Sequence, residues 1–170
     1  MRKNKWQVYP IFLLGFILFN SACAQNPLLT GQAYLNEEKL AAQTTVLLNN
    51  AGSLVPLQNL DKLKIASIHF SNQYASDFDS LLNKYAKVTT VNGSNYSGKK
   101  NLDDLSSELK WYNTLIVQLN QADLNDPLIF RFISANQKIK NVIVALFGNS
   151  NALLKLNDVT APVIWSERAS

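Results

Sequence analysis

Short apolar runs rich in β-branched residues alternate with helix-like segments through most of this 170-residue chain. The apolar runs predict five strands, at residues 65–70, 87–91, 114–119, 141–147 and 162–165. The segments between them predict helices, at residues 74–86, 102–111, 127–140 and 152–156. Strands separated by helices need crossover connections, which favour a parallel sheet. The sequence therefore predicts an α/β fold: a mostly parallel sheet of about five strands flanked by helices, in a Rossmann-like or flavodoxin-like three-layer sandwich.

A further helix is expected before the first of these strands. From Leu35 to Asn50, apolar residues fall roughly at helical spacing, and Asn36 is placed to cap the first turn. Gly52 follows as a stop signal. We therefore expect residues 35–50 to be helical.

The predicted helix 74–86 carries an apolar face at i, i+3, i+4 and i+7, formed by Phe78, Leu81, Leu82 and Tyr85. This phase puts Asp77 and Asp79 on the polar side. Two tryptophans, Trp111 and Trp165, are expected in the core rather than as platforms for sugar rings.

The first 24 residues have the layout of a secretory signal peptide. Basic residues at positions 2, 3 and 5 precede an apolar run at 8–19, and small residues follow at 21–24. The run has about 12 residues, too few to span the ~30 Å hydrocarbon layer as a helix. We expect residues 1–24 to be a signal, 25–34 a linker and 35–170 one domain. The alternative is an uncleaved N-terminal anchor.

Two processing routes stay open for this signal. Cleavage after Ala24 would use Ala22 and Ala24 as the small pair. Alternatively, residues 21–23 resemble a bacterial lipoprotein signal with Cys23 as the lipidated residue, although Asn20 stands where such signals usually have Leu. Both routes imply an exported chain, in the periplasm, in the outer membrane as a lipoprotein, or outside the cell. Membrane contact is expected only through the signal or the lipid anchor.

The net charge of +4 belongs mostly to this signal. Without residues 1–24 the chain has 13 basic and 12 acidic residues, so no nucleic-acid partner is expected. Cys23 is the single cysteine, which excludes an internal disulfide and a cysteine-based zinc site. With one histidine as well, we expect no metal site.

Motifs for cofactors and nucleophiles are absent. The sequence holds no glycine-rich dinucleotide fingerprint, no phosphate loop and no G-x-S-x-G, so we expect no cofactor. His69 ends a predicted strand, where α/β sheets build ligand sites, and a serine-hydrolase triad would have to use it. Asn149 and Glu167, each just after a later strand, are the other candidates for substrate binding. Each of the three also fits a plain polar role, and Glu167 fits the start of a helix.

Three close carboxylate pairs could in principle perform glycosidic acid–base chemistry. They are Asp77/Asp79, Asp103/Asp104 and Asp123/Asp126. The second pair lies in a helix first turn, where capping explains it. The first pair lies on the expected polar side of helix 74–86. We therefore assign no catalytic residue.

Two motifs resemble the second, C-terminal domain of glycoside hydrolase family 3. The first is TVLLNN at 45–50, SLVPL at 53–57 and LKIA at 63–66. It is similar to the family pattern S-x-V-L-L-K-N, then L-L-P-L, then a strand. The second is the strand 142–147 followed by Gly148, Asn149 and, at 152–153, Ala-Leu. It is similar to a strand followed by F-G-N-P-x-x-L, with Ser150 at the usual Pro. The resemblance covers residues 35–167.

This resemblance implies an exported module of a carbohydrate-active enzyme. Full-length members hydrolyse O-glycosyl bonds of β-glucosidase or β-N-acetylglucosaminidase type, and their nucleophile belongs to an N-terminal (β/α)8 barrel of about 250 residues. Nothing before residue 35 matches such a barrel, so no catalytic residue is carried over and we expect this chain alone to be non-catalytic. The implied partners are a family 3 barrel, missing or on a separate chain, and a β-linked carbohydrate.

The resemblance also implies that the domain continues past Ser170, which would leave the strand 162–165 uncovered on one face. The alternative function is a free-standing envelope domain that binds sugars or proteins. The residues do not identify the sugar.

Overall fold

The computed structural model describes residues 35, 36, 39, 44–50, 52–71, 73, 75–96 and 101–167. The chain forms two compact units, residues 1–42 and 43–170. In the first unit the three described residues, Leu35, Asn36 and Lys39, are helical. The expected signal, Cys23 and the expected linker 25–34 lie outside the described residues. Within the described part of the chain, no helix is long and apolar enough to cross a membrane.

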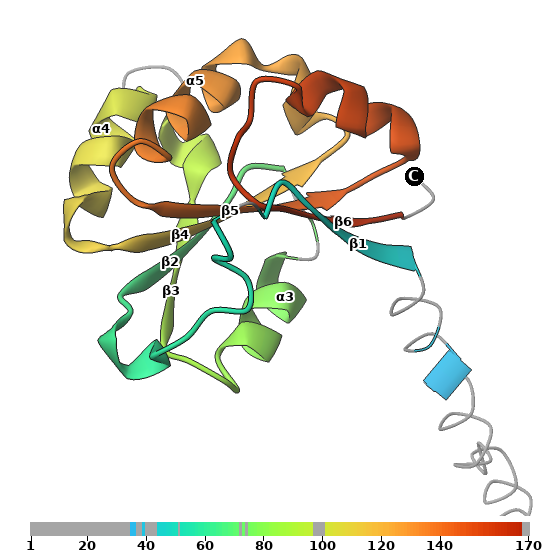
Figure 1. The fold of residues 1–170 in the computed structure, drawn as a ribbon. Helices are drawn as coiled ribbons and strands as arrows, with labels where there is room; N and C mark the ends of the chain where they lie inside the picture. The colour runs from blue at the N-terminus through green and yellow to red at the C-terminus, as the bar shows by residue number, and fades with distance from the viewer. Residues whose placement is uncertain are drawn as a thin grey trace, which may run out of the picture. The chain divides into compact units, whose positions relative to one another are not determined.

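The second unit is built on one six-stranded sheet (Figure 1). Its strands are β1 Thr45–Leu48, β2 Ile65–His69, β3 Val88–Asn92, β4 Thr114–Asn120, β5 Asn141–Phe147 and β6 Val163–Ser166. Its α-helices are α3 Ala75–Leu82, α4 Leu102–Glu108 and α5 Pro127–Asn136. Short 3-10 helices are η1 Leu60–Lys62, η2 Gly93–Tyr96, η3 Leu109–Trp111, η4 Asp123–Asn125 and η5 Ser150–Leu156.

The strand order is β1-β6-β5-β4-β2-β3, and every neighbouring pair is parallel except β1 with β6. The predicted α/β class and mostly parallel sheet are therefore confirmed. The five predicted strands are all present, with ends that differ by one residue at most. The parallel strands follow the flavodoxin-like order. The chain adds β3 on one side of β2 and then adds β4, β5 and β6 on the other side, so the strand order reverses between β2 and β4.

The predicted helix through Asn50 is wrong for its last part, because Thr45–Leu48 forms the edge strand β1. Val46 pairs with Trp165 and Leu47 with Ile164, in an antiparallel ladder. Consecutive β-branched residues before Leu47 suit a strand, and the open edge of β6 offers unpaired backbone groups. The strand 162–165, expected to be uncovered on one face, is paired along both edges, by β5 and β1, and Trp165 packs against the larger core.

The sheet has a large core on one face and a smaller one on the other. Figure 1 shows α4, α5 and η5 over the first face and α3 over the second. Alternate residues of β4 pack on opposite faces of the sheet: Leu115 and Val117 belong to the larger core and Ile116 to the smaller one. The period-2 alternation of strand side chains explains this division.

The helix α3 faces the sheet with a different stripe from the predicted one. Phe78 and Leu82 pack on the smaller core, as expected, but Leu81 and Tyr85 are 53% and 80% exposed. Asp79, expected on the polar side, is only 4% exposed. The helix is rotated because the sheet beneath it carries polar partners for Asp79, described below.

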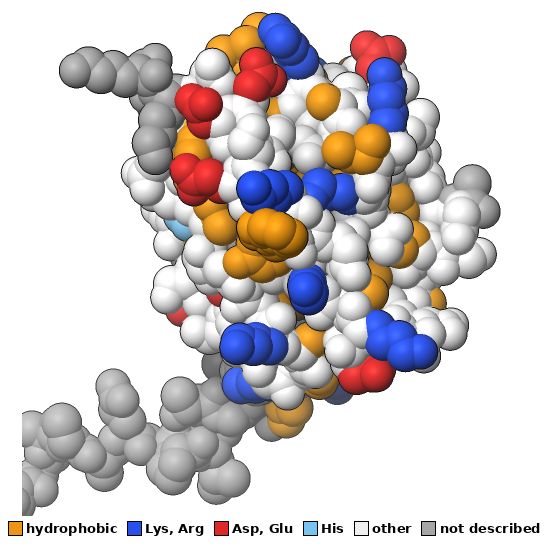
Figure 2. Space-filling view, turned by 90° about the vertical axis from the view of Figure 1, so that its left-hand side faces the viewer, with side chains coloured by type: hydrophobic (Ala, Val, Ile, Leu, Met, Phe, Trp, Pro, Cys, Tyr) orange, Lys and Arg blue, Asp and Glu red, His pale blue; other side chains and the backbone are white. Residues whose placement is uncertain are grey.

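Trp111 was also wrongly expected in the core, since its side chain is 71% exposed at the end of η3. It lies where β4 begins, at the amino end of the parallel strands. Figure 2 looks onto the left-hand side of Figure 1, where lysine and arginine side chains surround exposed hydrophobic ones.

The helix caps follow the sequence closely. Asn101 accepts hydrogen bonds from Asp103 N (2.8 Å) and Asp104 N (3.0 Å), and the Asp104 carboxylate accepts one from Asn101 N. This capping box confirms the capping role of the Asp104 carboxylate, and Asp103 lies in the same first turn. Pro127 opens α5 behind its N-cap Asp126, also as predicted.

Candidate functional site

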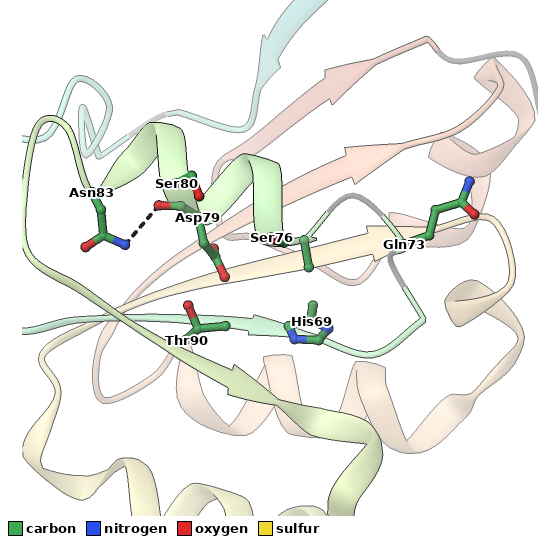
Figure 3. A pocket seen from close by; sticks show the side chains of 8 residues that line it. His69, Gln73, Ser76, Asp79, Ser80, Asn83 and Thr90 are labelled. Carbon is green, nitrogen blue, oxygen red and sulfur yellow. Dashed lines mark hydrogen bonds between the residues drawn. The ribbon is translucent and has the colours of Figure 1, made fainter.

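An open polar groove of about 670 Å³ lies between α3 and the strands β2 and β3. Its lining comes from the end of β2, the following turn, one side of α3 and the middle of β3. The lining residues are His69, Gln73, Ala75, Ser76, Asp79, Ser80, Asn83 and Thr90. Figure 3 shows the Asp79 carboxylate pointing from α3 toward the sheet, above Thr90 and His69. Seven of the eight lining residues thus carry a hydroxyl, amide, imidazole or carboxylate group.

The helix α3 presents this lining for local reasons. Residues at i, i+3 and i+4 share a helix side, so Ser76, Asp79 and Ser80 lie in one stripe. Asn83 ends the helix: its Nδ2 donates to Asp79 O at 2.9 Å, and its Oδ1 accepts from Val88 N at 2.9 Å. Asn83 therefore fixes the turn that connects the helix to β3.

Asp79 is the buried acceptor of the groove. Its Oδ1 accepts a 2.9 Å hydrogen bond from Gln118 Nε2, and the same nitrogen donates to Ser67 Oγ at 2.8 Å. Ser67 and Gln118 are both fully buried, on β2 and β4. Among the described residues, Asp79 Oδ2 is buried and has no hydrogen-bond partner. A buried acceptor left unsatisfied costs about 1–3 kcal/mol, so this oxygen favours a hydroxyl or amide donor from a ligand.

His69 ends β2 on the same face of the strand as Ser67, and it lines the groove. In the strand register it lies opposite Asn92 of β3 and Gln118 of β4. Within the described part of the chain, its ring makes no hydrogen bond with a serine or a carboxylate. The described residues thus form no Ser-His-Asp arrangement at His69, which lines the groove.

The other two candidates lie away from the groove. Asn149 is exposed, and its side chain accepts a hydrogen bond from Asn151 N at 3.1 Å, which makes it the N-cap of η5. Glu167 is exposed just after β6. Both follow strands on the far side of β4, and strands lie about 4.8 Å apart, so they are roughly 10–14 Å from His69. The structure therefore brings only His69 into the groove.

A second cavity, of about 340 Å³, lies at the carboxyl ends of β2 and β4. Asp123 is 5% exposed there: one carboxylate oxygen accepts from Ser71 Oγ and the other from Asn120 N at 2.8 Å. The Tyr96 hydroxyl donates to the Glu108 carboxylate. This hydrogen bond, with burial and the charges of Glu108 and Asp104, raises the pKa of Tyr96 above 10.0. Asp123 has its acceptors filled within the fold, so this cavity offers less to a ligand than the groove.

Sequence reasoning missed Asp79 and Gln118 as a pair. Gln118 had a signal, because it interrupts an otherwise apolar buried strand, TLIVQL. A buried amide needs partners, which points to a polar neighbour on the covering helix. No local signal distinguishes Asp79 from Asp77, since only the orientation of α3 buries one of them.

The groove can bind polar ligands but holds a single carboxylate. Glycosidic acid–base catalysis needs two carboxyl groups about 5–10 Å apart across the scissile bond. Asp77 lies on the same helix but does not line the groove. The described residues also contain no cluster of three or more metal-ligating side chains. The arrangement is suited to accept and donate hydrogen bonds to a ligand with many hydroxyl groups.

No family model matches this chain, and no curated protein matches its sequence. Among solved structures, the fold matches part of a fungal multi-domain GH3 β-N-acetylglucosaminidase, described as having a unique GCN5-related glucosamine N-acetyltransferase region. The TM-score is 0.60 and the identity 19%, over 79% of this chain and 16% of that one. At this identity the likeness is one of fold. It relates the chain to a region within a GH3 glycosidase, and this chain matches a small part of that protein.

Proposed function

We propose that the chain is an exported, non-catalytic module of a carbohydrate-active protein, of the kind found as the second domain in glycoside hydrolase family 3. In this proposal the groove beside α3 binds a β-linked carbohydrate and helps to form the wall of a sugar cleft. The observation that carries the proposal is the buried, unpartnered Asp79 Oδ2 in a groove lined by polar side chains. Carboxylates and amides that accept hydrogen bonds from ligand hydroxyls form the specific part of such sites.

Two further observations support the link to family 3. The motifs at 45–66 and 142–153 resemble the family's second domain in the right order. Independently, the fold matches a region of a GH3 enzyme. The strands β1, β2 and β5 lie within the two motifs, so the sequence resemblance falls on elements that build the sheet.

The groove supports binding rather than hydrolysis. Its single carboxylate offers no second group for acid–base chemistry, and His69 has no nucleophile beside it among the described residues. We therefore expect the purified chain from residue 25 not to cleave nitrophenyl β-glucoside or nitrophenyl β-N-acetylglucosaminide. Clear turnover would overturn the non-catalytic role.

Calorimetric titration of the chain with cellobiose and with N,N′-diacetylchitobiose tests the binding role. Saturable binding of one of them is expected, and Asp79→Asn should weaken it about ten- to a hundredfold, as for loss of a hydrogen bond to a charged acceptor. The amide oxygen of this variant can still accept from Gln118, so the unfolding midpoint should change little. The matched control is Asp77→Asn, which makes the same charge change two residues away on an exposed site. Equal weakening by both variants would contradict a site at Asp79.

The second candidate, a free-standing sugar-binding or protein-interaction domain of the cell envelope, is favoured by one feature. The strand β6 is flanked by β5 and β1, so its edge is already paired. A stable monomer that binds sugar without any barrel would favour this alternative. If the chain bound sugar much more tightly after a family 3 barrel was added, the result would favour the proposal that the chain is a module of such an enzyme.

A further inference from the structure

The amino ends of the parallel strands form a second surface with its own composition. Segments 60–64, 83–87, 108–113 and 137–140 precede the neighbouring strands β2, β3, β4 and β5. They hold seven of the 16 basic residues of the whole chain, all lysines, against two acids, Asp61 and Glu108. Outside the expected signal the net charge is close to zero, but the basic residues are concentrated at the amino ends of the parallel strands.

Each of these segments also exposes one large hydrophobic side chain. The exposed fractions are 38% for Leu60, 80% for Tyr85, 71% for Trp111 and 76% for Ile139. Six of the seven lysines are exposed beside them: Lys62, Lys64, Lys84, Lys87, Lys110 and Lys138. We call these ten residues the amino-edge surface. Figure 2 shows this side of the molecule, with basic side chains around hydrophobic ones.

The amino-edge surface is held on a rigid base. Asn113 joins two of its segments, because its Nδ2 donates to Lys62 O at 3.2 Å and its Oδ1 accepts from Lys64 N at 2.9 Å. The seventh lysine, Lys140, donates to Leu109 O at 2.6 Å and Tyr112 O at 2.8 Å, which ties a third segment to these two. These hydrogen bonds tie three of the four segments to one another, so this part of the surface is a fixed array rather than a set of independent loops.

We propose that the amino-edge surface docks the folded unit onto an anionic lipid bilayer. Lysines attract anionic headgroups, and their long stems let apolar neighbours reach the interface while the charge stays in water. Tryptophan and tyrosine are the residues that prefer the headgroup level. Protein interfaces, in contrast, are depleted in lysine and enriched in arginine. The surface holds no arginine, and its residues line neither of the two cavities described above.

This contact goes beyond the expected anchorage through a signal or lipid. An anchor at the N-terminus would hold the chain near the bilayer, and the amino-edge surface would then orient the unit. The carboxyl edge, with the end of β2 and the second cavity, would face away from the lipid.

Co-sedimentation with vesicles tests the proposal, with the chain from residue 25. This form keeps every residue of both core clusters, since all of them follow residue 47. We expect binding to phosphatidylcholine–phosphatidylglycerol vesicles at low salt, weakening as salt rises, and little binding to pure phosphatidylcholine. Each lysine removed should weaken binding about fivefold, so Lys110→Gln with Lys138→Gln should cost about 30-fold.

The matched control is Arg131→Gln with Lys155→Gln, which makes the same charge change away from the amino edge. The control should bind nearly as the parent does. A blue shift of tryptophan emission on binding, lost in Trp111→Phe, would support contact of Trp111 with lipid. Equal weakening by the two double variants would overturn the proposal. Equal binding to vesicles with and without phosphatidylglycerol would also overturn it. The same holds if the chain binds an acidic protein through this surface but does not bind vesicles.

Discussion

Gln118 on β4 donates a 2.9 Å hydrogen bond to Asp79 Oδ1 on α3, across 39 positions of sequence. The bond sets the rotation of the only α-helix that covers this face of the sheet in the described residues. Asp79 lines the groove, and its second oxygen is buried without a hydrogen-bond partner among the described residues. One contact thus links the packing of α3 to the chemistry of the candidate site.

Replacing Gln118 by leucine should destabilise the fold by about 1–3 kcal/mol, because Asp79 then loses its donor inside the protein. Urea unfolding measures the change. The double variant Gln118→Leu with Asp79→Leu should recover much of it, since replacing both partners leaves no unpaired polar group. A single variant as stable as the parent would show that the pair contributes little.

The strand β1 predicts unequal losses of stability for alanine substitutions at two neighbouring leucines. Leu48 packs against the larger core, whereas Leu47 is 41% exposed. Leu48→Ala should therefore cost about 2 kcal/mol and Leu47→Ala less than about 1 kcal/mol. Thermal or urea unfolding of the two variants provides the comparison. Equal losses would argue against a strand in which these side chains point to opposite faces.

The capping box at α4 predicts a moderate loss. Asn101→Ala removes the acceptor of two backbone donors and should cost about 1 kcal/mol. Asn151→Ala, at another exposed asparagine whose side chain caps no helix, serves as control and should stay within about 0.5 kcal/mol of the parent. The same unfolding midpoints for both variants would be inconsistent with a cap at Asn101.

Tyr96 predicts a dependence of stability on alkaline pH. The hydrogen bond to Glu108 raises the pKa of Tyr96 in the folded state above 10.0. Above pH 10.0 the unfolded chain loses this proton first, so the free energy of unfolding falls as pH rises toward the folded pKa. Burial lowers the pKa of Lys140, which acts in the opposite direction but is common to all variants.

Tyr96→Phe should therefore show a shallower decline of the urea midpoint above pH 10.0 than the parent. Tyr85→Phe, at a site 80% exposed, should keep the parent's slope. If Tyr96→Phe declined as steeply as the parent, the hydrogen bond to Glu108 could not be the cause.

Some elements could be predicted because their signals are local. The strands β4 and β5 are short, nearly continuous apolar runs rich in β-branched residues, a pattern typical of strands in a sheet that is covered on both faces. Asn101 and Pro127 mark helix starts through their own side chains. His69 could be placed at the carboxyl edge of the sheet, the edge at which α/β folds bind ligands, because it ends a parallel strand.

Other features depended on residues far away in sequence. Residues 45–48 fit a helix by spacing, but they form β1 because β6 offers an edge to pair with. Trp111 is exposed because it lies in a connection at the amino edge rather than on a covered face. The separation of charge could not be seen in the net charge, since it arises only when four segments meet at one end of the sheet.

The amino-acid order alone was enough to predict the α/β class, the five parallel strands, the helix caps and the position of His69 at a strand end. These features follow from side-chain periods and capping groups within a few residues of one another. The packed fold was needed to show that Asp79 is buried, that it shares a hydrogen-bond network with Gln118 and Ser67, and that six exposed lysines share one surface. Burial and proximity are properties of packed elements, so residues as alike as Asp77 and Asp79 acquire different roles only when α3 packs on the sheet.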